Sequence, residues 1–161
     1  MHEWLDNHMN EQENIDLQRF VEAQELDYEQ ALKEIRQGRK MSHWIWYIFP
    51  QIQGLGHSIM AERYAINSLE EAGAYINHPV LGARLIEIST ALLRHAKDGF
   101  LTKSKTAEQI LGNIDALKVR SCMTLFDLVQ PNSIFSNVLD AFYNSERDPL
   151  TLEILKRQAM K

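Results

Sequence analysis

Apolar side chains recur through most of the chain at the spacing that gives an amphipathic helix one buried face. The clearest stripes repeat every three or four residues: Tyr28, Ala31, Leu32 and Ile35, then Leu81, Leu85, Ile88 and Leu92. Residues 114–129 become apolar on nearly all sides towards their end, which is typical of a central helix. No run alternates apolar and polar residues as a half-buried strand does. The pattern predicts an all-α fold, a single compact, irregular bundle of about seven to nine short helices.

Polar residues suited to helix capping precede several of these runs. Ser68 and Thr106 each stand three residues before a Glu or a Gln, which is the spacing of a capping box. Ser42 and Ser58 are simpler candidate caps. Asp148 is followed by a proline suited to the first turn of a helix. These signals predict where the helices begin.

The length of 161 residues suits one domain, which we expect at residues 15–158 behind a disordered acidic tail at residues 1–14. The formal net charge of −5 divides into −7 for residues 1–37 and +2 for the remainder. A domain with so little positive charge is not expected to bind nucleic acid. The longest apolar run, residues 44–49, is far too short to cross a membrane, so no membrane partner is expected either.

The single cysteine cannot form an internal disulfide, which favours a cytoplasmic protein over a secreted, disulfide-stapled one. No cluster of Cys, His or carboxylate residues has the spacing of a metal site. The lack of predicted strands argues against the common nucleotide-binding folds. We therefore expect no metal ion and no cofactor.

The most unusual segment begins at residue 42 and holds two tryptophans, a tyrosine and a phenylalanine within six residues. Trp44 and Trp46 either belong to the core or wall a pocket in which a planar ligand stacks, with Gln51 as a polar neighbour. His43 opens this helix and is expected to be neutral, because a helix N-terminus disfavours a charged imidazole. It is a candidate base, or else a structural histidine bonded to the backbone.

Two further features could bind an anion. Gly54 and Gly56, followed by Ser58, could turn their backbone amides towards a phosphate or carboxylate, although many tight turns between helices look the same. Arg84 falls on or beside the buried stripe of its helix, where a guanidinium needs a bound anion or a carboxylate partner. Glu87 or the acidic N-terminal helices could supply that carboxylate in a purely structural ion pair.

A third feature lies in the predicted central helix. Asp115, Lys118 and Ser121 are spaced at i, i+3 and i+6, so Lys118 can reach either neighbour. Lys118 could serve as the base for a nucleophilic Ser121. The alternative is an Asp115–Lys118 ion pair with the Ser121 hydroxyl bonded back into its own helix. Cys122 fits a small buried hydrophobe.

Several of these motifs together resemble a bacterial family known as domain of unknown function 1810. Gly-Arg-Lys-x-Ser-His-Trp-x-Trp spans residues 38–46, and Phe-Pro-Gln-x-x-Gly-Leu-Gly-x-Ser spans residues 49–58. Similar motifs continue to about Leu155, although Cys122 stands where a second serine is expected. The resemblance implies a compact all-helical fold and supplies no reaction. Such sequences are sometimes labelled calpastatin, a label that the apolar content of this chain contradicts.

The leading hypothesis is a pocket for a small anionic ligand, phosphate-bearing or nucleotide-like, built from Trp44, Trp46, Gln51, Gly54, Gly56, Ser58 and Arg84. Hydrolase or transferase chemistry in that pocket would fall to His43, Lys118 and Ser121. The sequence does not decide whether the protein is an enzyme. The alternative is a non-catalytic protein-interaction module that works through its acidic front end or through the loop carrying Lys103 and Lys105.

Overall fold

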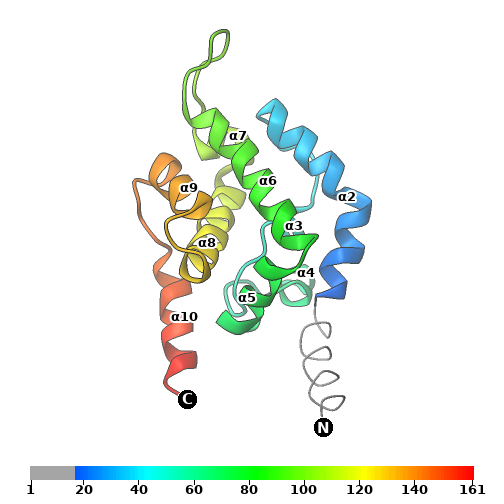
Figure 1. Cartoon of the computed structure of the whole chain (residues 1–161), viewed down its shortest axis with the longest axis vertical. Coiled ribbons are helices and arrows are strands. Elements are labelled where there is room, and N and C mark those ends of the chain that lie inside the picture. The colour runs from blue at the N-terminus through cyan, green and yellow to red at the C-terminus, as the bar shows by residue number, and fades with distance from the viewer. Residues whose placement is uncertain (1–16) are drawn as a thin grey trace.

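The computed structural model describes residues 17–161, and the tail expected at residues 1–14 lies outside this range. Within the described range the chain forms nine α-helices and one short 3-10 helix, and no strand, which confirms the all-α fold (Figure 1). The elements are α2 (Gln18–Gln37), α3 (Ile45–Ile48), α4 (Ile59–Arg63), α5 (Leu69–Asn77), α6 (Leu81–Leu93), η1 (Arg94–Ala96), α7 (Ala107–Leu111), α8 (Asn113–Val129), α9 (Ile134–Phe142) and α10 (Pro149–Ala159).

Helix α8 is the central element, as its apolar pattern predicts. It packs against α5, α7, α9 and α10. Val119, Cys122 and Phe126 on this helix are fully buried. The ring of Phe126 lies 5.3 Å from that of Tyr75 on α5 and 5.7 Å from that of Phe135 on α9. One aromatic cluster therefore joins three helices at the core.

Helix α6 runs beside α2 and returns against α5 (Figure 1). The approach to α5 depends on Gly82, because a Cβ built there would lie 2.0 Å from the carbonyl oxygen of Ile76. No side chain can occupy that position without moving the backbone. His78 starts the turn, and its Nδ1 accepts the backbone N–H groups of Val80 at 3.1 Å and Leu81 at 3.2 Å.

Most of the predicted caps are confirmed. The side chains of Ser58, Ser68 and Asp148 each accept a backbone N–H in the first turn of their helix. Thr106 begins a complete capping box. The box predicted at Ser68 is only half formed, because the Glu71 carboxylate binds other partners: Arg19 at 3.0 Å and Asn67 at 3.0 Å.

The cap predicted at Ser42 is wrong. Helix α3 begins three residues later, and its N-cap residue is Trp44, which makes no side-chain cap bond. The Ser42 hydroxyl instead donates a hydrogen bond of 2.7 Å to the carboxylate of Glu34 on α2. A buried acceptor on the preceding helix has therefore taken the place of the local cap.

None of the helices from α2 to α10 combines the length and the apolar character needed to cross a membrane.

Candidate functional site

A groove of about 500 Å³ lies between the turn that precedes α4, the first half of α8 and the start of α10. Its polar lining includes Gln51, Lys118, Arg120 and Asp148. Its apolar lining includes the half-buried ring of Trp46 and four aliphatic side chains: Leu55, Ile114, Leu117 and Leu150. Segments that are far apart in the sequence therefore share one surface hollow.

The structure brings six of the ten predicted site residues to this groove: Trp46, Gln51, Gly56, Ser58, Lys118 and Ser121. Gly54 lines a smaller adjoining hollow together with Trp46, Gln51 and Gly56. The remaining three, His43, Trp44 and Arg84, do not line either hollow.

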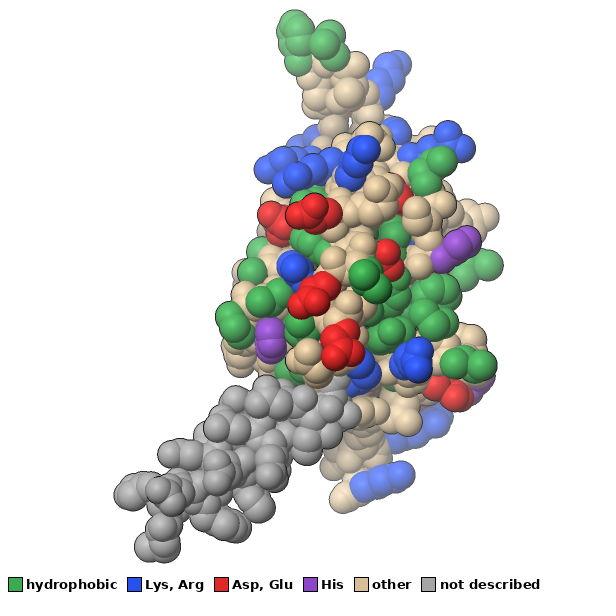
Figure 2. Space-filling model, turned by 90° about the vertical axis from the view of Figure 1, so that its right-hand side faces the viewer, with side chains coloured by type: hydrophobic (Ala, Val, Ile, Leu, Met, Phe, Trp, Pro, Cys, Tyr) green, Lys and Arg blue, Asp and Glu red, His purple; other side chains and the backbone are tan. Residues whose placement is uncertain are grey.

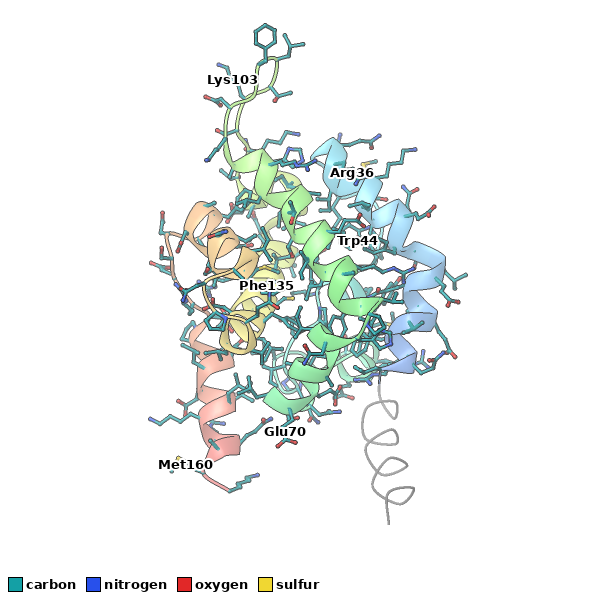
Figure 3. The ribbon with its side chains drawn as sticks, viewed as in Figure 1. Arg36, Trp44, Glu70, Lys103, Phe135 and Met160 are labelled. Atoms are coloured by element: carbon teal, nitrogen blue, oxygen red, sulfur yellow. The ribbon has the colours of Figure 1, made fainter. Side chains whose placement is uncertain are left out.

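Trp44 belongs to the core, with 1% of its surface exposed (Figure 3). Its indole N–H donates to Glu34 at 3.0 Å, and its ring packs beside that of Phe49. Trp46 lies in α3, two residues after the N-cap residue Trp44. Side chains two positions apart along a helical turn point in nearly opposite directions. For this reason only the second tryptophan reaches the groove. Of the two interpretations open for this pair, Trp44 takes the core and Trp46 lines the hollow.

His43 is exposed at the surface and does not face the groove residues. Arg84 forms no ion pair among residues 17–161, so the structural ion pair proposed for it, with Glu87 or with the acidic N-terminal helices, is not formed there. The guanidinium instead lies 5.0 Å above the ring of Tyr28, and Glu87 accepts the Tyr28 hydroxyl at 2.5 Å. The Arg84 Nη1 is buried without a hydrogen-bond partner in the described part of the chain.

Glu34 positions the segment that carries both tryptophans, a role that the sequence analysis missed. Its buried carboxylate accepts the backbone N–H groups of Met41 at 2.7 Å and Ser42 at 2.9 Å, besides the Ser42 hydroxyl and the Trp44 indole. Burial opposes the charge, but hydrogen bonds from Ser42, Gln30 and the Met41 amide outweigh it and lower the pKa of Glu34 to about 2. The carboxylate is therefore charged and holds the loop from α2 to α3.

Two lysines share one carboxylate at the edge of the groove. The Nζ of Lys40 lies 2.9 Å from Asp115 Oδ2, and the Nζ of Lys118 lies 3.5 Å from Asp115 Oδ1. Lys118 also stands 5.4 Å from the centre of the Trp46 ring. With two cations to one anion, this cluster carries a surplus positive charge. Lys118 is the more exposed of the two lysines and brings that charge to the groove.

A second cation, Arg120, also lines the groove and was not among the predicted residues. Its Nη2 lies 3.2 Å from Asp148 Oδ1, while its Nε is buried and has no partner within the described residues. Asp148 is already committed to α10, since its Oδ2 accepts both the Thr151 N–H at 3.0 Å and the Thr151 hydroxyl at 2.6 Å. The pairing of Arg120 with the cap of another helix has no local signal in the sequence.

The backbone and packing of the turn at residues 54–58 explain why it contains two glycines. Gly54 has a φ of +104°, which disfavours other residues, and a Cβ at Gly56 would lie 2.8 Å from that of Ala61. The Ser58 hydroxyl accepts the Ala61 N–H at 3.1 Å. The turn forms one wall of the groove, and its role in anion binding stays a prediction.

The geometry around Ser121 matches the structural alternative. Its hydroxyl donates to the Leu117 carbonyl at 3.2 Å, and Lys118 is paired with Asp115. Among residues 17–161 no hydrogen bond joins Lys118 to Ser121, and no group of three His, Cys, Asp or Glu side chains could hold a metal ion. Burial raises the pKa of the Cys122 thiol well above its usual range, so this cysteine is kept as an uncharged core residue.

Comparison with known proteins shows the family of the chain and a similar solved structure. No curated protein matches the chain. The crystal structure of the conserved hypothetical protein Rv1873 from Mycobacterium tuberculosis is similar, with a TM-score of 0.80 and 41% sequence identity. The similarity covers 88% of this chain and 96% of that one. The family model described as protein of unknown function DUF1810 matches residues 14–155. The chain therefore belongs to the DUF1810 family.

Proposed function

We propose that the groove binds a small molecule with an anionic, phosphate-like group and a planar ring, in the cytoplasm of a bacterium. The observation that carries the proposal is the meeting of Lys118, Arg120 and the half-buried ring of Trp46 in one hollow. The lone, buried cysteine supports a reducing compartment. Binding of a nucleotide-like molecule would use both the cations and the ring.

The size and lining of the groove suit such a ligand. A volume of about 500 Å³ falls within the range of pockets for small molecules, which are mostly apolar with a few placed polar groups. Trp46 offers part of a flat aromatic surface on which a planar ring can stack. Leu55, Leu117 and Leu150 can cover the remainder of an apolar group.

Both cations have capacity left for an anion. Lys118 shares Asp115 with Lys40, so the three groups together retain one positive charge. Arg120 is bound to Asp148 through Nη2 alone, and its Nε lacks an acceptor within the described residues. A phosphate or carboxylate oxygen at the Arg120 guanidinium would supply the missing acceptor.

Catalysis by His43, Lys118 and Ser121 is not part of this proposal. A base must lie within hydrogen-bond reach of the group that it activates. His43 lies outside the groove, Lys118 is paired with Asp115, and Ser121 donates to its own helix. The geometry supports binding better than hydrolysis or group transfer.

A peptide-binding groove is the second candidate, and one observation favours it. Three aliphatic side chains at the groove are largely exposed: Ile114 at 72%, Leu117 at 58% and Leu150 at 63%. Such a rim resembles the apolar contacts that receive an amphipathic helix. This candidate corresponds to the interaction module that the sequence leaves open, placed on a different surface.

Thermal unfolding in the presence of nucleotides, sugar phosphates and ADP-ribose tests the first candidate. A ligand at 100 times its dissociation constant should stabilise the fold by about 2.7 kcal/mol. Lys118→Gln should weaken that ligand about tenfold or more, and Trp46→Leu should do the same. Lys33→Gln is the matched control, because this exposed lysine lies on α2 away from the groove.

His43→Ala and Arg84→Ala serve as further controls, and neither should change the affinity. A ligand whose affinity is unaffected by Lys118→Gln and Trp46→Leu would contradict the proposed groove. Failure of the whole panel, together with a peptide whose binding is lost in Leu117→Ser and Leu150→Ser, would establish the second candidate instead.

A further inference from the structure

The loop between η1 and α7 projects from one end of the bundle (Figure 1), and Figure 2 shows hydrophobic side chains at its tip. Phe100 is 100% exposed and Leu101 is 89% exposed. Two large hydrophobic residues side by side at an exposed tip cost solubility and usually mark a contact surface.

The loop is braced by its own hydrogen bonds. The Gly99 N–H donates to the Thr102 carbonyl at 2.7 Å, directly across the tip. The Ser104 N–H donates to the Asp98 carboxylate at 2.7 Å, and the Lys105 N–H donates to the His95 carbonyl at 2.8 Å. The projection is therefore a defined turn that holds the Phe100–Leu101 pair outward.

Cations gather near the base of this projection, where Figure 2 shows blue side chains at the upper end of the molecule. We call six exposed residues the basic collar: Lys33, Arg36, Arg39, Arg94, Lys97 and Lys103. Within residues 17–161 none of them forms an ion pair with a carboxylate, whereas six other cations do.

The collar is assembled from two separate parts of the chain. The end of α2 and the loop are joined where His95 Nε2 meets the Ile35 carbonyl at 2.6 Å and Lys105 Nζ meets the Gly38 carbonyl at 3.1 Å. Arg36 and Lys103 consequently lie at the same end of the molecule, far from Met160 (Figure 3).

The charge of this end is opposite to that of the rest of the protein. Residues 33–40 and 94–105 hold eight of the 17 lysines and arginines and only two acids, a net charge of +6 in a chain of net charge −5. Outside these two segments, residues 17–161 hold 9 lysines and arginines and 15 acids, a net charge of −6. Such a separation orients the molecule in the field of an anionic surface.

We infer that this end of the protein docks on an anionic lipid surface, with Phe100 and Leu101 in the interfacial layer and the basic collar against the headgroups. A convex apolar tip ringed by cations matches a surface that is negative outside and apolar beneath. A nucleic acid backbone would attract the collar but would leave the Phe100–Leu101 tip in water. The apolar run at residues 44–49 is too short to span a membrane, but a peripheral contact needs no spanning segment.

Flotation of the full chain with lipid vesicles tests this inference. Vesicles containing about 30% phosphatidylserine should bind the protein, and vesicles of phosphatidylcholine alone should bind it at least about tenfold more weakly. Raising the salt from about 0.1 M to about 0.5 M should weaken binding several-fold, because the collar's attraction is screened.

Variants separate insertion from plain electrostatic attraction. Phe100→Ser with Leu101→Ser should lower the partition onto anionic vesicles about tenfold, since both side chains are withdrawn from the interface. Leu26→Ser is the matched control, because Leu26 is an exposed leucine at 86% outside the collar and the loop. Lys97→Gln with Lys103→Gln should lower binding to anionic vesicles and leave the residual binding to neutral vesicles unchanged.

An environment-sensitive fluorophore reports the orientation. Cys122 is fully buried, so Thr102→Cys adds an accessible thiol beside the tip, and Met160→Cys adds one at the opposite end. The emission of the label at residue 102 should shift to the blue on anionic vesicles, and that of the label at residue 160 should not.

Absence of vesicle binding would overturn the inference, as would equal binding of the Phe100→Ser/Leu101→Ser variant. Collar-dependent binding to duplex DNA but not to vesicles would also overturn it and would assign this end to nucleic acid.

Discussion

The carboxylate of Glu34 accepts the indole N–H of Trp44 at 3.0 Å, so a buried charge on α2 fixes the first turn of α3. The same carboxylate accepts hydrogen bonds from Gln30, Met41 and Ser42. Since Trp46 follows two residues after Trp44, the wall of the groove depends on an acid that does not line it. This relationship links the stability of the fold to the shape of the proposed site.

Glu34→Gln should lower the free energy of unfolding by about 2–4 kcal/mol, because an amide group would face donors that now meet a carboxylate. Urea unfolding at neutral pH measures the loss. Glu29→Gln, on an exposed face of the same helix, is the matched control and should change stability by less than about 0.5 kcal/mol. Equal effects of the two substitutions would show that the carboxylate of Glu34 is not needed by the loop.

The wild-type protein should lose stability in acid through the same residue. The pKa of Glu34 is lowered from 4.5 to about 2, so its ionised form favours the folded state. This stabilisation is complete above about pH 4.5 and disappears as the pH falls towards 2, a loss on the order of 3 kcal/mol. The difference in unfolding free energy between the wild type and Glu34→Gln should therefore become smaller as the pH falls from about 4.5 to about 2. A gap that stays constant from pH 6 to about pH 2.5 would contradict the assignment.

Two glycines on neighbouring elements should respond in opposite directions to the same substitution. Gly82→Ala should cost at least about 2 kcal/mol, because its Cβ would collide with the Ile76 carbonyl and force α5 and α6 apart. Gly73 lies within α5 and has nothing within 4 Å of a built Cβ. Gly73→Ala should therefore stabilise the protein by about 0.5–1 kcal/mol through its helix propensity. Thermal unfolding of both variants tests the pair, and a tolerated Gly82→Ala would mean that the helices are not in such close contact.

The features that sequence could predict are those determined locally. Apolar spacing predicts the second half of α2, and α6 and α8, and short polar signals predict the caps at Ser58 and Thr106, because each depends on residues within one or two turns. Ser42 shows where this reasoning ends. Its hydroxyl could have capped the next helix, but it donates instead to the carboxylate of Glu34, eight residues earlier.

The candidate site likewise contains residues that could be identified from the sequence and residues that could not. Lys118 and Trp46 were identified because a lysine beside a serine and a cluster of tryptophans are conspicuous in sequence. Arg120 was missed, since its importance comes from the pairing with Asp148, 28 residues later, across two helices. His43 and Arg84 have chemistry suited to a site, but the packing of α3 and α6 directs them elsewhere. Residue type alone does not determine which side chains share a hollow.

Thr106 and Asp148 are both N-caps whose side chains accept a backbone N–H, but Thr106 is exposed and Asp148 is buried. Thr106→Ala, at an exposed cap, should cost about 1 kcal/mol of unfolding free energy. Asp148→Ala should cost about 3 kcal/mol, because it removes the bonds to Thr151 and also leaves Arg120 without its carboxylate. Urea unfolding of both variants gives the difference.

A double-mutant cycle assigns the origin of that difference. If the excess cost comes from the unpaired guanidinium, Arg120→Met should recover a good part of it in the Asp148→Ala background, while costing stability in the wild type. The same variant also tests binding in the groove. An anionic ligand that binds at Arg120 should raise the unfolding free energy of the Asp148→Ala variant more than that of the wild type. Additive effects of the two substitutions would show that Arg120 and Asp148 are not coupled, and that the cap alone explains the loss.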